Sequence, residues 1–471
     1  MSKFQNDLTS GSVVGQLMRF SLPFLLSNLL QALYNMADML IVSRFCGAVG
    51  SAAVSMGGQV TILVINLISG LAVGGTVLIA QYIGAKRQED VERTVATMFT
   101  LYLIAGAVIT VAMLLSGGWI LRAMNASDEA FDDTLAYLNI CMGGTLFVVG
   151  YNAVSAVLRG MGDSKHPLIF VAISAGLNVV LDLVLVGPLH MGPAGAAWAT
   201  IASQAVSLII SVVFLRRRNF VFDFHPRSFR IHKGYVGKLV SLGLPASLQG
   251  TLVSFSFMVL TGIANIVAVT PLVGTTVLGI AGKVNSVAIL PSMAMQASVS
   301  SLVGQNMGAG KTDRARKTML AAMGFAFLMS AAVFALVNLF PGGIVQVFLG
   351  SSETENMSAE TLAHCVAYGA EYLRMISYDY LLTSVLFCIT GLAMGVGQTL
   401  FSMCNGILSS LLLRIPAAYL FGKVLGWGLA GVGLAAPCAS AGGLLVGVIY
   451  LLTGSWKKGR LVQPAPESVT D

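Results

Sequence analysis

The sequence predicts an all-α polytopic membrane protein with twelve transmembrane helices in two pseudo-symmetric six-helix lobes. Of its 471 residues, 56% are hydrophobic and only 10% are charged. The apolar residues form long blocks, and several short motifs recur in the second half of the chain. Soluble domains carry about 25% charged residues, so a water-soluble fold of this size would lack the charges to cover its surface. Lipid is the solvent that suits this composition.

Each apolar block is close to the roughly 20 residues that a helix needs to cross the hydrocarbon of a bilayer. The 52 glycines suit such helices, because small residues let membrane helices approach closely. We expect twelve spans, at 15–43, 53–80, 94–116, 134–159, 166–188, 193–216, 236–262, 275–303, 318–342, 362–392, 400–424 and 429–453.

The basic residues indicate the orientation of these spans. Most of the 27 Lys and Arg residues fall in connections on one side of the membrane, whereas those on the opposite side hold only Arg44, Arg122 and Lys423. Cytoplasmic loops are enriched in Lys and Arg, so we expect both termini in the cytoplasm. The same rule accounts for the net charge of +7 without a nucleic-acid partner.

Recurring motifs divide the chain into two similar halves. Gln81–Gly84 (QYIG) recurs as Gln305–Gly308 (QNMG), and Gly160–Gly162 (GMG) recurs as Gly395–Gly397 (GVG). Because each half has an even number of spans, both halves have the same orientation, as in transporters built from parallel repeats. Two lobes around a central cavity are a transporter design. We find no Walker loop, metal-ligand spacing or nucleophile–base arrangement, and therefore expect neither an enzyme nor a cofactor.

The expected organisation follows from the spans and the repeat. It consists of a cytoplasmic N-terminus (1–14), a first lobe with spans one to six (15–216), a cytoplasmic inter-lobe linker (217–235), a second lobe with spans seven to twelve (236–453) and a cytoplasmic tail (454–471).

Two aspartates lie deep within predicted spans of the first lobe. Asp38 is in the first span and Asp182 is in the fifth. A charge at the centre of a bilayer costs at least about 2.5–3.5 kcal/mol, so such residues are candidates for function. Asn178 lies four residues before Asp182 and therefore shares its helix face.

Neutral polar side chains accompany the two aspartates. Gln31, Tyr34 and Asn35 form a polar stripe with Asp38 on the first span, and we expect Asn152 and Thr200 to lie nearby. Such oxygens suit a hard monovalent cation such as Na⁺, and they equally suit a carboxyl that binds a proton. The alternative is a hydrogen-bond network that only packs the lobe.

The second lobe also holds charged residues within its spans. They include Lys283, Arg414 and Asp379. Arg414 could neutralise a carboxylate or bind backbone carbonyls, and Asp379 could face the outer mouth of the cavity. Structural pairing is the alternative for each, and the sequence leaves their roles open.

The chain resembles the multidrug and toxic compound extrusion (MATE) family in its prokaryotic branch. The stretches that carry the resemblance are Leu33–Gly47, Gln81–Lys86, Leu158–Pro167, Asn178–Asp182, Gly195–Thr200 and Gln305–Lys311. The resemblance implies a V-shaped pair of lobes in a bacterial or archaeal cell membrane, acting as a monomer. It also implies secondary active efflux of organic, often cationic, drugs or amphiphiles in exchange for Na⁺ or H⁺.

The resemblance also assigns residue roles. It places ion coupling, with a possible Na⁺ site, at Asp38, Asn178, Asp182 and Thr200, and it places cavity positions at Tyr34 and Asn152. An alternative is a lipid-linked oligosaccharide flippase of the same superfamily, whose cavity would hold several basic residues; here only Lys283 and Arg414 are available. A non-transporting sensor or membrane enzyme would need a soluble domain or a catalytic constellation, and we find neither.

Overall fold

The computed structural model describes residues 4–124, 128–218, 220–349, 357–459 and 461–462. The ends of the expected N-terminus (1–14) and tail (454–471) therefore lie partly outside the described residues. Within those residues the chain consists of helices joined by short connections. Ten of its helices are long and apolar enough to cross a membrane, and two bent helix pairs bring the number of spans to twelve, as predicted.

The first half contains six helices. They are α1 (Val13–Gly84), α2 (Gln88–Ala123), α3 (Asp128–Gly143), α4 (Thr145–Gly160), α5 (Lys165–Val186) and α6 (Gly192–Arg217). Two spans are contained in α1, which breaks at Gly47, where φ is 66° and ψ is −160°. That left-handed backbone region is readily open only to glycine. Helices α3 and α4 form one span bent by 47°.

The second half has a matching order. Its helices are α7 (Lys233–Val267), α8 (Pro271–Ala288), α9 (Leu290–Gly308), α10 (Thr312–Leu339), α11 (Pro341–Phe348), α13 (Ala359–Gly395), α14 (Thr399–Ile407), α15 (Arg414–Tyr419) and α16 (Gly428–Leu452). The eighth span is the pair α8 and α9, bent by 43°. Two π-helical stretches, Leu408–Leu413 and Leu420–Val424, flank α15 and complete the eleventh span.

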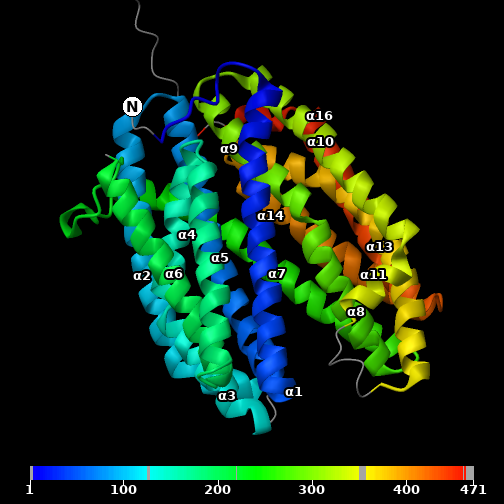
Figure 1. Ribbon diagram of the computed structural model, residues 1–471. Helices are drawn as coiled ribbons and strands as arrows, with labels where there is room; N and C mark the ends of the chain where they lie inside the picture. The colour runs from blue at the N-terminus through cyan, green and yellow to red at the C-terminus, as the bar shows by residue number, and fades with distance from the viewer. Residues whose placement is uncertain (1–3, 125–127, 219, 350–356, 460, 463–471) are drawn as a thin grey trace, which may run out of the picture.

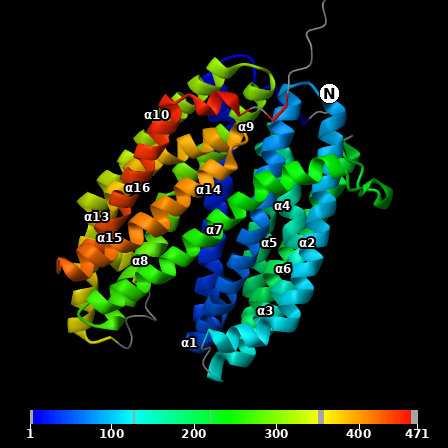
Figure 2. The ribbon, with the colours of Figure 1, turned by 180° about the vertical axis from the view of Figure 1, so that it is seen from behind.

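The helices form two bundles that approach at one end and diverge towards the other (Figures 1 and 2). The N-terminal segment and the described C-terminal end both lie at the end where the bundles meet. The first turns of α1 and α7 cross between the bundles there. Leu17 and Phe20 of α1 pack with the core of the second bundle, whereas Leu239 and Leu242 of α7 pack with the core of the first.

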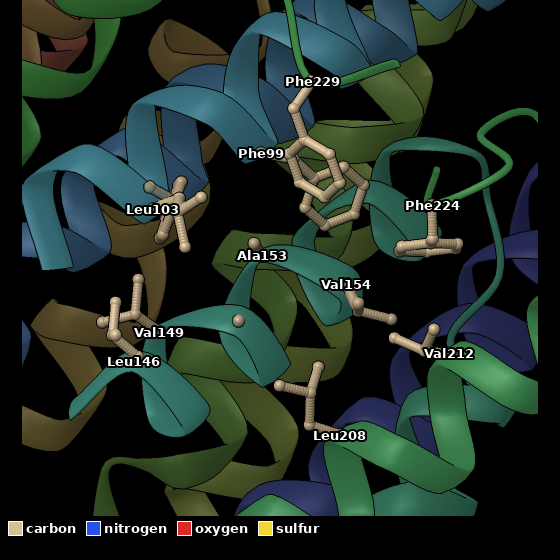
Figure 3. Close-up of a pocket in the computed structure, with 12 residues that line it drawn as sticks. Phe99, Leu103, Leu146, Val149, Ala153, Val154, Leu208, Val212, Phe224 and Phe229 are labelled. Carbon is tan, nitrogen blue, oxygen red and sulfur yellow. The ribbon is translucent and has the colours of Figure 1, made fainter. Parts of the chain in front are cut away.

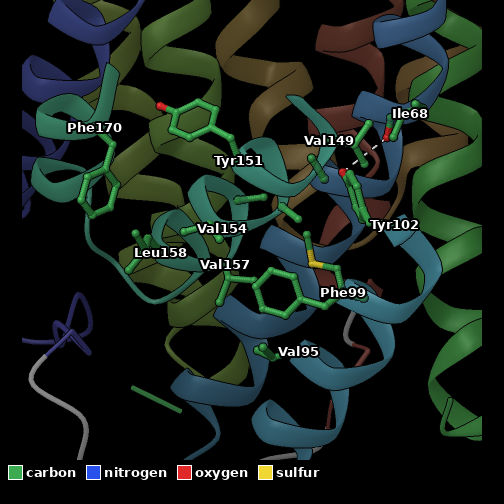
Figure 4. Close-up of a cluster of buried hydrophobic side chains, with 14 of the residues drawn as sticks. Ile68, Val95, Phe99, Tyr102, Val149, Tyr151, Val154, Val157, Leu158 and Phe170 are labelled. Atoms are coloured by element: carbon green, nitrogen blue, oxygen red, sulfur yellow. Dashed lines mark hydrogen bonds between the residues drawn. The ribbon is translucent and has the colours of Figure 1, made fainter. Parts of the chain in front are cut away.

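Aromatic residues tie the inter-lobe linker to the first bundle. Phe222 packs against Phe99 of α2 and against Phe224 and Phe229 of the linker, with ring centroids 5.1 Å apart in each pair. The core beneath them is dense, and the Tyr102 hydroxyl donates a hydrogen bond to the Ile68 carbonyl of α1 (Figure 4). The linker is therefore a packed part of the first bundle.

Candidate functional site

Two aspartates from different helices meet inside the first bundle. Asp38 of α1 and Asp182 of α5 interact through their carboxyl groups. Asp182 is completely buried, while Asp38 is half-buried. When both carboxyls are ionised, neither can donate a hydrogen bond to the other, and two like charges repel in a medium of low dielectric constant. The pair therefore needs a proton or a cation to become electrostatically satisfied.

Several buried oxygens around the pair form no hydrogen bond. They are Oδ1 of Asp38, both carboxyl oxygens of Asp182, Oδ1 of Asn178 and Oε1 of Gln204. A buried polar atom without a partner costs about 1–3 kcal/mol, and more when it is charged, so such atoms require an explanation. All of them are oxygen atoms that accept hydrogen bonds, and oxygen atoms are also the ligands that a hard cation prefers.

The helices α5 and α6 position the neutral members of this group. Asn178 lies one turn before Asp182 on α5 and is 1% exposed. Its amide Nδ2 donates to Oγ1 of Thr200 on α6, at 3.5 Å. Since the amide nitrogen is engaged there, Oδ1 of Asn178 remains free to accept. The structure thus brings together the four residues of the expected ion site.

Sequence reasoning missed two further neighbours. Gln204 lies four residues after Thr200 on α6, and it interacts with Tyr34, which also interacts with Gln31. Tyr137 of α3 is buried within electrostatic range of both aspartates. The spacing of four from Thr200 was the available signal for Gln204. Only the three-dimensional packing of α3 against α1 identifies Tyr137.

Two of the expected cavity residues are not among these unpartnered buried acceptors. Asn35 is exposed on α1. Asn152 donates from Nδ2 to the Val148 carbonyl of its own helix, at 2.9 Å, and lies beside Tyr102 and Ser69. A side chain that can bond within its own helix need not turn towards a neighbouring polar group.

A separate cavity of about 170 Å³ lies among α2, α4 and α6 under the linker (Figure 3). Its walls are almost entirely apolar and include Phe99, Leu208 and Phe224. Its chemistry is suited to hydrocarbon, and it is distinct from the aspartate pair.

The charged residues of the second bundle have local partners. Asp379 accepts a hydrogen bond from Thr383, at 3.1 Å, and Tyr380 lies within electrostatic range of both Asp379 and Arg414. The Arg414 guanidinium lies over the ring of Phe257, 4.8 Å from its centroid. Lys283 is half-buried on α8.

Comparisons with known proteins agree with this architecture. The chain is 28% identical over 459 residues to "Probable multidrug resistance protein YpnP" of Bacillus subtilis, covering 97% of this chain and 98% of that protein. It is 23% identical over 426 residues to "Multidrug export protein MepA" of Staphylococcus haemolyticus, covering 88% of each.

Solved structures show the same fold. An "outward-facing conformation of a multidrug resistance MATE family transporter" matches with a TM-score of 0.88 and 27% identity, over 96% of this chain and 98% of that one. A transporter of the same superfamily from Pyrococcus furiosus matches with a TM-score of 0.89 and 28% identity, over the same shares. The MatE family model matches residues 23–184 and 245–420, one segment in each bundle. The chain therefore belongs to the MatE family, the multidrug and toxic compound extrusion transporters.

Proposed function

We propose that this protein is a secondary active antiporter that exports organic, often cationic, compounds in exchange for Na⁺ or H⁺. The observation that carries the proposal is the group of unpartnered buried acceptors at Asp38, Asn178 and Asp182. A bundle that only needed to pack would satisfy these atoms with donors from its own helices. Relatives named as multidrug resistance and export proteins support organic compounds as the cargo.

The different burial of the two aspartates suggests how an ion enters. Asp38 is half-buried on α1, and Asp182 lies completely buried beside it. An ion reaching Asp38 would draw the two carboxyls together and cancel their repulsion. Because Asp38 is on α1 and Asp182 is on α5, ion binding favours one arrangement of these helices over another. Coupling requires only that ion and cargo prefer different arrangements by a few kcal/mol.

The test is efflux of a fluorescent organic cation from proteoliposomes under a Na⁺ or an H⁺ gradient, imposed separately. Gradient-driven efflux should be lost in Asp38→Asn, because the amide removes the charge that attracts the ion. The matched control is Asp379→Asn, which alters a buried aspartate of the second bundle already bonded to Thr383. Efflux in Asp38→Asn at the wild-type rate under both gradients would refute the proposal.

A further inference from the structure

Two glutamines connect the bundles at the end where the termini lie. Nε2 of Gln81, on α1 of the first bundle, donates to the carbonyl of Gly395, at the end of α13 in the second. That distance is 2.9 Å. Nε2 of Gln305, on α9 of the second bundle, donates to the carbonyl of Gly160, at the end of α4 in the first, at 3.5 Å. Both glutamines are completely buried. Each therefore reaches across the interface in the opposite direction to the other.

The backbones cross closely beside these bonds. A Cβ atom on Gly84 would lie 1.9 Å from the Gln305 carbonyl oxygen, and one on Gly308 would lie 2.0 Å from that of Gln81. Only glycine permits such an approach. The recurrent motifs of the sequence thus meet each other here, glutamine and glycine of one half against glutamine and glycine of the other.

Each glutamine also holds a terminal segment. Oε1 of Gln305 accepts from the amide of Leu8, at 3.0 Å, and Oε1 of Gln81 accepts from the amide of Leu461, at 3.1 Å. The side chain of Leu461 also packs on Gly397. A Cβ atom on Gly397 would lie 2.6 Å from that side chain. The side-chain amide of each glutamine thereby uses its donor on the opposite bundle and its acceptor on a chain end.

The N-terminal segment itself spans the two bundles. The amide of Asn6 donates to the Met161 carbonyl of the first bundle, at 3.0 Å. Further along, Arg314 of α10 donates to the carbonyls of Ser10 and Gly11, at 2.7 Å each. Phe4 belongs to the core of the first bundle, whereas Leu8 belongs to the core of the second. Parting the bundles at this end therefore requires this segment to leave one of them.

These bonds have a property that bonds within one bundle lack. Their donors and acceptors separate when the bundles part at this end, so the bonds stabilise only the arrangement in which this end is closed. A contact made in one of two states shifts the balance between them, whereas a contact made equally in both does not.

We propose that Gln81 and Gln305, with the terminal segments they hold, form a paired latch that sets the balance between the two orientations of the transporter. The inference rests on the proposed function, in which the two bundles alternate between openings. The glutamines are positioning residues, since they touch neither ion nor cargo. Weakening the latch populates the state open at the end where the termini lie.

The test measures the opening directly. Glu89 (α2) and Arg316 (α10), both exposed at this end, are replaced by spin-labelled cysteines. Pulsed electron–electron double resonance between the two labels then measures the separation of the bundles. The exposed native cysteines, Cys404 and Cys438, are replaced by alanine. In Gln81→Ala combined with Gln305→Ala, the ratio of open to closed populations should rise on the order of tenfold, as expected for losing interfacial hydrogen bonds. Each single variant should give a smaller rise.

The matched control is Asn405→Ala. Asn405 is also a buried carboxamide that donates to a glycine carbonyl, that of Gly443 at 3.1 Å, but both residues belong to the second bundle. It should leave the distance distribution unchanged. If the double variant fails to fold, the single variant Gln305→Ala decides, because it removes the donor to Gly160 and leaves Gln81 with both of its bonds.

An unchanged distribution in the folded glutamine variants, or an equal shift in Asn405→Ala, overturns the latch. The proposed function is judged separately, since the label distances require no ion gradient. A shifted distance with intact efflux in Asp38→Asn would leave the latch standing and remove the proposed coupling site.

Discussion

At the residue scale, the aspartate pair destabilises the first bundle in which it lies. Asp182 is completely buried with both oxygens unpartnered, although an asparagine would fit the same space and could donate to Asp38. Buried acceptors without donors destabilise a fold. Unsatisfied groups of this kind concentrate at functional sites, where ligand binding supplies the missing interaction.

This reasoning gives opposite effects of Asp182→Asn on stability and on coupling. The amide supplies a donor to the Asp38 carboxyl and removes the repulsion between two carboxylates, so the melting temperature in detergent without Na⁺ should rise. Gradient-driven efflux should fall to the level of empty liposomes. Asn178→Ala serves as the comparison, because it removes an acceptor without adding a donor and should weaken coupling with no gain in stability. A lower melting temperature together with intact coupling in Asp182→Asn would contradict the interpretation.

At the element scale, the sequence predicted more of the fold than of the site. Apolar block length and loop charge gave the twelve spans, because the bilayer imposes both. The breaks were less accessible: the bend between α8 and α9 falls at Ile289, just before Pro291, and periodicity alone does not separate a bent span from a straight one. The crossing of α1 and α7 between bundles was not predicted. Leu17 and Leu239 are apolar wherever they pack, so their partners depend on the three-dimensional arrangement.

The helix crossing at Gly84 yields the next prediction. Gly84→Ala places a methyl group against the Gln305 backbone, which cannot move away as a flexible side chain could. Overpacking of this kind costs about 1–3 kcal/mol. We expect a lower melting temperature and a shift of the Glu89–Arg316 label distance towards the open state.

The control for this substitution lies on the same helix. A Cβ atom on Gly58 has nothing within 4 Å, so Gly58→Ala should be neutral, or stabilising by roughly 0.5–1 kcal/mol through helix propensity. Equal destabilisation by the two substitutions would show that the crossing at Gly84 has no special importance.

At the scale of the whole molecule, the two bundles contribute segments to each other's cores at one end, as far as the described residues show. The first turns of α1 and α7, the latch glutamines and both terminal segments all connect the bundles there, and the bundles diverge towards the other end (Figure 2). The connections that the sequence predicts to be cytoplasmic, rich in Lys and Arg, lie at the connected end. With that orientation, the arrangement described is closed towards the cytoplasm, and we expect an ion to reach the half-buried Asp38 from the outside.

The orientation is testable by labelling with a membrane-impermeant maleimide in a background where Cys404 and Cys438 are alanine. A cysteine replacing exposed Asp132, near the start of α3, should react in intact cells. A cysteine replacing Arg316 should react only after the cells are permeabilised, because its end of the molecule carries most of the Lys and Arg residues, which membrane insertion retains inside. The reverse pattern would place the latch on the outer side, so that the closed arrangement would face inward and an ion from the cytoplasm would be the one able to reach Asp38. The side that this arrangement faces does not itself set the direction of transport, because the bundles of an alternating transporter open to each side in turn and the ion gradient then drives cargo the opposite way.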